Sequence, residues 1–272
     1  MKIALCLSGY FNSLKDNTSQ GSDGFSYIQK HILSKREEGH EVDVFFHNWE
    51  PFLEQTLVNL YKPVDYIIES QIDFNNIAEE NGVSRRHLDT KGALGSWSLD
   101  SKQGAGYVGP ERILSQYYSV QKSFELMRAH EKKNNFRYDC VIKSRFDLGQ
   151  VNRRHQAKEF MQLGIEPQPC QCIDFNTEYD MKHFYQAYWD LFNEGPADMW
   201  FYSSSENMEC FSTLYNKALR EYFQIGSDYS KVVTTGWPES SATSFRSNEI
   251  EKNPEDREKN LYKYPSHMVV NA

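Results

Sequence analysis

Residues 138–148 read YDCVIKSRFDL, and this stretch has the pattern of a buried strand that ends in charged side chains. An apolar run over 140–142 contains no residue that breaks a strand. Lys143, Arg145 and Asp147 then follow at every second position. Alternate side chains of an extended chain point to one face of the sheet. We therefore expect two cations and a carboxylate to project together from the end of this strand.

Strand and helix patterns alternate before this stretch. Strand patterns occupy residues 2–8, 42–49 and 64–70, and helical patterns occupy residues 25–39, 52–61 and 111–135. This alternation predicts an α/β fold with a mainly parallel sheet flanked by helices. We expect the strands at 2–8, 42–48 and 138–146 to be parallel neighbours. The second half is less regular, with a strand pattern at 197–205 and a helical pattern at 206–223 that Ser205 is expected to cap.

Length and composition limit the classes of protein that fit. The 272 residues suit one large domain, with an α/β half at 1–150, a second half of the same domain at 151–247 and a polar segment at 248–272. The net charge of −8 argues against nucleic-acid binding. No apolar run approaches the roughly 20 residues that span a bilayer. The five cysteines are an odd number and favour reduced thiols in a cytoplasmic protein.

The ends of the first two strands are candidate ligand-binding segments. Ligands of parallel α/β sheets bind beyond the carboxyl ends of the strands. The first strand ends in Ser8, Gly9 and Tyr10, where a small residue and backbone N–H groups suit a nucleotide, although neither GK[ST] nor GxGxxG follows. The second strand ends in His47 and Trp49, which suit a donor pocket. A tight turn at Ser-Gly and packing roles for His47 and Trp49 are the alternatives.

The charged end of residues 138–148 suits a nucleotide diphosphate. Arg145, through its planar fork, and Lys143 are cations that phosphate groups bind. Asp147 supplies hard oxygen for Mg²⁺ or Mn²⁺ shared with phosphate oxygens. The alternative is an Arg–Asp surface pair without a function.

The order of these motifs resembles a group of bacterial and viral glycosyltransferase-like proteins. In that group a first strand ending in Ser-Gly is followed by Asp-Val-Phe-x-His-x-Trp, which stands here at 43–49. A helix carrying Tyr-Ser comes later, here Tyr118 and Ser119, and a strand ending in Arg-x-Asp follows, here Arg145 and Asp147. The resemblance makes Tyr118 and Ser119 candidates for the donor site.

The resemblance covers residues 1–150 well and 196–223 loosely, and it implies a GT-A-like fold. Such enzymes transfer a sugar from a nucleotide-diphosphate sugar to a glycan or another hydroxyl acceptor. They use an Asp-x-Asp motif to hold a metal that bridges the diphosphate. Arg145 stands here in place of the first aspartate, which leaves Asp147 as the metal ligand and puts the divalent cation in question more than the fold.

An acceptor-side carboxylate is also expected if the reaction inverts the anomeric centre. Asp198 and Glu239 are the candidates for the base that deprotonates the acceptor hydroxyl; an ordinary exposed carboxylate is the alternative for each. The glycine-rich segment 92–109 is expected to be a lid or acceptor loop. Two other functions stay open: a non-catalytic nucleotide- or glycan-binding protein, and a nucleotidyltransferase.

Overall fold

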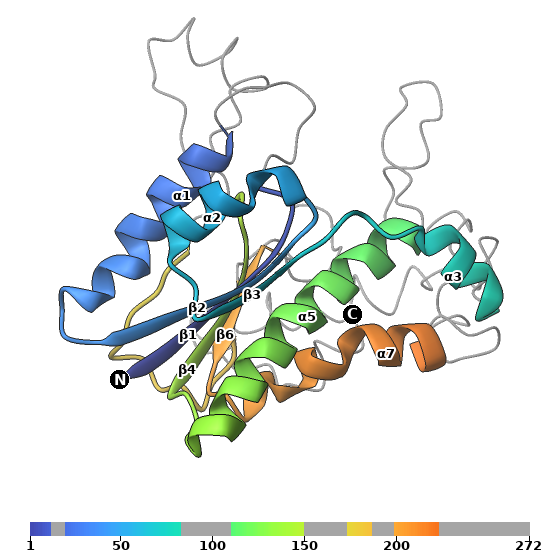
Figure 1. The fold of residues 1–272 in the computed structure, drawn as a ribbon. Helices are drawn as coiled ribbons and strands as arrows, with labels where there is room; N and C mark the ends of the chain where they lie inside the picture. The colour runs from blue at the N-terminus through green and yellow to red at the C-terminus, as the bar shows by residue number, and fades with distance from the viewer. Residues whose placement is uncertain (12–19, 83–109, 150–172, 187–198, 223–272) are drawn as a thin grey trace, which may run out of the picture.

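The computed structural model describes residues 1–11, 20–82, 110–149, 173–186 and 199–222. In this part of the chain a six-stranded sheet carries helices on both faces (Figure 1). The predicted α/β class is therefore confirmed.

The sheet is mixed rather than mainly parallel. Its strands are β1 (Lys2–Gly9), β2 (Glu41–Asn48), β3 (Asp65–Ile68), β4 (Cys140–Arg145), β5 (Tyr185–Gln186) and β6 (Trp200–Ser203). They lie in the order β3-β2-β1-β4-β6-β5. Strands β1 to β4 are parallel, whereas β6 runs antiparallel to β4 and β5 antiparallel to β6. The three strands expected to be parallel neighbours are therefore found side by side as β2, β1 and β4.

Helices of the described part of the chain lie on both faces of the sheet. The helices of the first half are α1 (Gln20–His31), η1 (Leu33–Arg36), η2 (Pro51–Leu53), α2 (Glu54–Tyr61), α3 (Phe74–Glu80) and α5 (Pro110–Asn134). Those of the second half are η4 (Asn207–Thr213), α7 (Leu214–Lys217) and the π-helical turn η5 (Ala218–Tyr222). Figure 1 shows α1 and α2 over one face of the sheet and α5 and α7 over the other.

The segment expected to form one helix after Ser205 is divided into three short pieces. Ser205 does not cap them, because its hydroxyl donates instead to Glu131 Oε1 at 2.6 Å. The capping prediction was wrong since a buried carboxylate on α5 competes for the same hydroxyl.

The core has two layers, one on each side of the central strands. In β1, Ile3 and Leu5 belong to the layer beneath α1 and α2, whereas Ala4 and Cys6 belong to the layer beneath α5. Burial on both faces explains why this strand reads as a continuous apolar run instead of an alternating one.

The strand order reverses between β1 and β4. From β1 the chain passes through α1 to β2 and then to β3 on one side, and it returns through α5 to β4 on the other side of β1. The crossover helices α1 and α5 lie on opposite faces (Figure 1). In open α/β sheets such a reversal leaves a crevice outside the carboxyl ends of the two strands, and this is where ligands bind.

None of the helices in the described part of the chain is long and apolar enough to cross a membrane. Cys6 and Cys140 are buried free thiols, and Cys210 is a partly buried one.

Candidate functional site

The ends of β1, β2 and β4 meet at one rim. Ser8 pairs in register with His47 on one side and with Arg145 on the other. Gly9 then takes a φ of +98°, a left-handed conformation that glycine adopts at little cost. The predicted convergence of these three strand ends is therefore present.

Backbone N–H groups after β1 are already engaged by side chains. The Gly9 N–H donates to Ser119 Oγ at 2.8 Å, and the Phe11 N–H donates to Glu50 Oε2 at 2.6 Å. Exposed backbone N–H groups after β1 were expected to suit a nucleotide. They instead fix the turn, because a backbone donor in a site of low exposure needs a partner within the protein.

A second set of bonds ties this turn to the end of β2. Asn48 Nδ2 donates to the Gly9 carbonyl at 3.0 Å and to Glu50 Oε2 at 3.4 Å. The Glu50 N–H donates to Asn48 Oδ1 at 2.7 Å. Both side chains are buried, which holds the two loops in one geometry. The sequence predicted no role for Asn48 or Glu50, although two polar residues flanking Trp49 at a strand end were the available signal.

Lys143, Arg145 and Asp147 do not line up along one strand as expected. Strand β4 ends at Arg145, and Asp147 lies in the turn that follows. Lys143 is 2% exposed, and its Nζ lies 5.3 Å from the centre of the Phe201 ring. Lys143 therefore lies below the rim, beside Cys6 of β1, and only Arg145 stands at the strand end.

Arg145 and Asp147 form a two-pronged ion pair. Arg145 Nε and Nη2 donate to the two carboxylate oxygens of Asp147 at 2.9 and 2.7 Å. The Arg145 side chain is 35% exposed and that of Asp147 is 9% exposed. Gly24 of α1 packs so close that a Cβ there would meet the Phe146 carbonyl. The turn after β4 is thereby held against the start of α1.

Asp147, the residue expected to bind a divalent cation, is paired with Arg145. Both carboxylate oxygens already accept hydrogen bonds from Arg145. Among the described residues, no group of three or more His, Cys, Asp or Glu side chains is arranged to hold a metal ion. An ionised carboxylate has about four lone-pair sites, so a cation at Asp147 would either share these oxygens with Arg145 or displace it, and the metal role of Asp147 stays a prediction.

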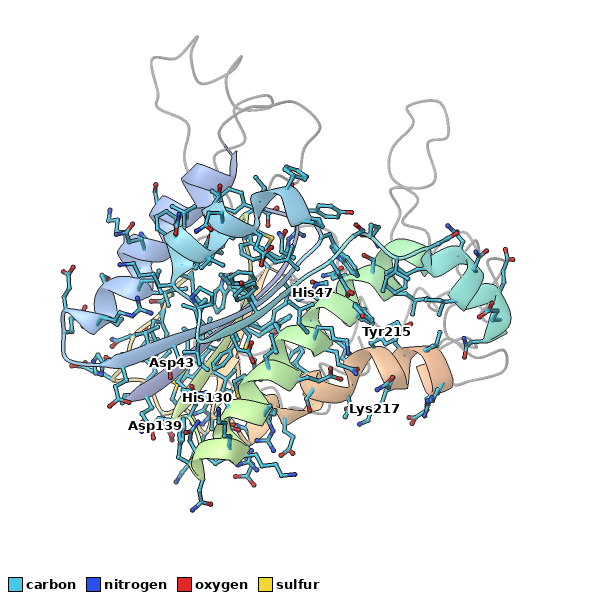
Figure 2. The ribbon with its side chains drawn as sticks, in the orientation of Figure 1. Asp43, His47, His130, Asp139, Tyr215 and Lys217 are labelled. Carbon is cyan, nitrogen blue, oxygen red and sulfur yellow. The ribbon has the colours of Figure 1, made fainter. Side chains whose placement is uncertain are left out.

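His47 is the centre of a hydrogen-bonded chain beneath this rim. It is fully buried, and Figure 2 places it where the end of β2 meets α5. Its Nδ1 lies 2.8 Å from Ser119 Oγ, and its Nε2 lies 3.0 Å from Glu69 Oε1. A carboxylate only accepts, so the neutral ring carries its proton on Nε2 and accepts at Nδ1 from the Ser119 hydroxyl. Each donor in this chain then has an acceptor: the Gly9 N–H donates to Ser119 Oγ, the Ser119 hydroxyl donates to His47 Nδ1, and His47 Nε2 donates to Glu69.

The environment of His47 favours this neutral ring. Burial lowers the pKa of His47, and the hydrogen bond and charge of Glu69 oppose that effect without reversing it. The residue expected to line a donor pocket thus links β1, α5 and the residue after β3.

Trp49 and Tyr118 pack against each other and against the His47 ring. Their rings stack with centres 5.5 Å apart, and both contact Phe74 of α3. Tyr118 also meets Tyr215, which Figure 2 places between α5 and α7. Trp49 is only 4% exposed, so its contacts are those of a packing residue, the alternative that the sequence left open.

A row of exposed polar groups continues the rim beyond β2. The Tyr10 hydroxyl donates to Gln71 Oε1 at 2.7 Å, and Gln71 Nε2 donates to Ser115 Oγ at 3.0 Å. Glu69 lies at the end of β3 beside them, with its side chain 35% exposed. Glu69, Gln71 and Ser115 were not predicted from the sequence, although Glu69 obeys the same strand-end rule that selected His47.

The two candidate bases lie outside the described residues. Asp198 and Glu239 fall in segments of which the structure describes nothing, as does the glycine-rich segment 92–109. These expectations stay predictions.

Comparison of the chain with protein-family models and with curated proteins gives no match. The resemblance to glycosyltransferase-like proteins therefore rests on the order of motifs alone.

Proposed function

We propose that the chain is a GT-A-like glycosyltransferase that transfers a sugar from a nucleotide-diphosphate sugar to a glycan or other hydroxyl acceptor. The observation that supports this most is the position of Arg145 at the reversal of strand order. It ends β4 beside the glycine turn of β1, with a side chain 35% exposed. A planar guanidinium at this crevice suits a diphosphate, because its fork binds two phosphate oxygens at once.

In the proposed reaction the acceptor oxygen attacks the anomeric carbon of the donor sugar. The bond from that carbon to the diphosphate oxygen breaks, and its electron pair leaves with the nucleoside diphosphate. Arg145 would stabilise the negative charge that develops on the leaving group. Asp198 and Glu239 remain the proposed bases for the acceptor proton. A divalent cation, if one binds, would be held by Asp147 and would neutralise charge on the diphosphate.

A non-catalytic nucleotide- or glycan-binding protein is the alternative. The ion pair between Arg145 and Asp147 favours it, since each group neutralises the other in the ligand-free protein. Arg145 also stands in place of the first aspartate of an Asp-x-Asp motif, so only Asp147 remains.

A thermal-shift screen with UDP, GDP, dTDP and CMP sugars, each with and without Mn²⁺, tests nucleotide-sugar binding. A ligand that binds only the folded state raises the melting temperature by mass action. Arg145→Lys should weaken the binding of any active donor about tenfold, because a point charge does not replace a two-pronged fork.

Release of the nucleoside diphosphate from the bound donor then separates the enzyme from the binding protein. Binding without release, with water or with a panel of sugar acceptors, would favour the alternative. If no nucleotide sugar shifts the melting temperature, the proposed function is wrong.

A further inference from the structure

Glu69 stands at the carboxyl edge of the sheet, one residue beyond β3. The last residues of β1, β2 and β3 lie in register, with Asn48 paired to both Gly9 and Ile68. Glu69 and Tyr10 are therefore at equivalent positions on the rim, each one residue beyond the end of its strand. It is a rim residue that the proposed role of Arg145 does not use.

A buried donor fixes the direction of the Glu69 carboxylate, because His47 Nε2 donates to Glu69 Oε1 from 3.0 Å. Burial and then the nearby Glu69 raise the pKa of the Tyr118 phenol, which keeps its proton beside the carboxylate. An ionised carboxylate has about four lone-pair sites, so Glu69 retains acceptor capacity. With the side chain 35% exposed, that capacity faces solvent.

The neighbours of Glu69 match one kind of ligand. Tyr10 is 41% exposed, and its hydroxyl is fixed by Gln71, which in turn bonds Ser115. A partly exposed aromatic ring beside fixed acceptors and donors suits a sugar ring, which carries apolar C–H groups and directional hydroxyls.

We propose that Glu69 binds two adjacent hydroxyls of a sugar ring at the edge formed by Tyr10, Gln71 and Ser115, and that His47 is the residue that positions it. A carboxylate at the surface is hydrated without help from a buried histidine. His47 bonds Ser119 through one ring nitrogen and Glu69 through the other, and these two bonds hold the carboxylate in one orientation.

The diol can come from two sources, and both rest on the proposed function. Three strand spacings separate β3 from β4, so Glu69 lies about 14 Å from Arg145 along the rim. A donor with its diphosphate at Arg145 could place its ribose at Glu69. An acceptor saccharide carries the same pair of hydroxyls.

Isothermal titration of the full chain distinguishes these sources. UDP and GDP are compared with 2′-deoxy-UDP and 2′-deoxy-GDP, and methyl glycosides of glucose, galactose and N-acetylglucosamine are titrated separately. The same titrations use Glu69→Gln, the conservative Glu69→Asp, and Glu80→Gln as a control for loss of one exposed carboxylate on α3. Melting temperatures check that each variant is folded.

A ribose site is supported if the wild type prefers a ribonucleotide at least tenfold over its deoxy form and Glu69→Gln removes that preference. A saccharide site is supported if nucleotides show no such preference while a glycoside binds at least tenfold more weakly to Glu69→Gln. Glu69→Asp should retain part of the preference, and Glu80→Gln all of it.

The proposal is overturned if no ligand loses affinity in Glu69→Gln, or if the wild type binds neither class. Nucleotide binding without diol preference in either class overturns the diol site and leaves the proposed function standing. Glycoside binding that depends on Glu69, without any nucleotide binding, supports the diol site and overturns the proposed function.

Discussion

Arg145 and Asp147 are paired with each other in the ligand-free protein, so a phosphate ligand of Arg145 competes with the Asp147 carboxylate. A diphosphate that binds the Nε–Nη2 edge of Arg145 must replace two hydrogen bonds of 2.9 and 2.7 Å to Asp147. The affinity for a diphosphate therefore reflects the strength of the new contact minus that of the existing pair. This competition is the main chemical difference between the observed rim and an Asp-x-Asp motif.

Asp147→Asn tests this competition directly. The substitution keeps the shape, removes one negative charge and loosens the hold on Arg145. With EDTA present, we expect the affinity for UDP or GDP to rise by up to about tenfold, or 1.4 kcal/mol. Glu38→Gln, which removes an exposed charge in the turn between η1 and β2, should leave that affinity unchanged.

The same variant separates the two roles considered for Asp147. A loss of affinity that occurs only with Mn²⁺ present would favour the metal role expected from the sequence. Unchanged affinity with and without Mn²⁺ would mean that the pair has no part in nucleotide binding.

Tyr61 has a hydroxyl without a hydrogen-bond partner among the described residues. The side chain is fully buried between α2 and the sheet, and burial raises the pKa of its phenol. Removing an unpaired buried hydroxyl removes its desolvation penalty. We expect Tyr61→Phe to raise the free energy of unfolding by about 1 kcal/mol in urea titrations.

Tyr202→Phe is the matched control for Tyr61→Phe. Tyr202 is equally buried, but its hydroxyl donates to the Asp174 carbonyl at 2.6 Å. Its loss should lower the free energy of unfolding by about 1 kcal/mol. Effects of the same sign in both variants would contradict the explanation.

At the scale of elements, the helix and strand with the longest sequence patterns, α5 and β1, are present where the sequence predicted them. The helix expected at 111–135 is α5, Pro110–Asn134, because 25 residues give its apolar stripe many repeats. Strand β1 followed equally from its apolar run. The seven-residue α3 was missed since its pattern is short, although Asp73 caps it by accepting from the Asn75 N–H.

Contacts between distant segments were not predictable from local pattern. The direction of β6 is set by pairing with β4, and an apolar run reads alike in either direction. His47 and Ser119 stand 72 residues apart, so no spacing rule connects them. The strand-end rule found the rim, but it did not identify which groups there bond one another.

Glu131 joins three elements at the opposite end of the sheet. Its Oε1 accepts from the Tyr138 N–H at 2.8 Å and from the Ser205 hydroxyl at 2.6 Å, and its Oε2 accepts from Arg128 at 2.7 Å. The side chain is 2% exposed. One carboxylate on α5 thus holds the approach to β4 and the segment after β6.

Glu131→Gln should therefore destabilise the fold strongly. The amide nitrogen must face at least one donor, and Arg128 keeps only Glu209 as a charged partner, so we expect a loss of about 2–4 kcal/mol in chemical unfolding. Glu125→Gln on the same helix breaks an exposed pair with Lys122 and should cost less than about 1 kcal/mol. Equal losses would show that the buried network adds nothing beyond a surface pair.

At the scale of the whole molecule, His47 couples stability to pH. Burial lowers the pKa of His47 below its unfolded value of about 6.5. A base whose pKa is lower in the folded state takes up a proton more readily when unfolded. The free energy of unfolding should thus be at its full value above pH 6.5 and fall as the pH drops toward the folded pKa, by up to about 1.4 kcal/mol per pH unit.

Urea unfolding at pH 8, 7, 6 and 5 measures this slope. His47→Gln should lower stability at pH 8, because the bonds to Ser119 and Glu69 are disturbed, but it should flatten the decline between pH 7 and 5. His31, half-buried on α1 with its pKa lowered by burial and by Lys30 and Lys35, contributes with the same sign. His31→Gln should therefore flatten the decline less than His47→Gln. If the slope of His47→Gln equals that of the wild type, His47 is protonated as easily in the folded chain as in the unfolded one, and the neutral ring inferred for the chain from Gly9 to Glu69 is wrong.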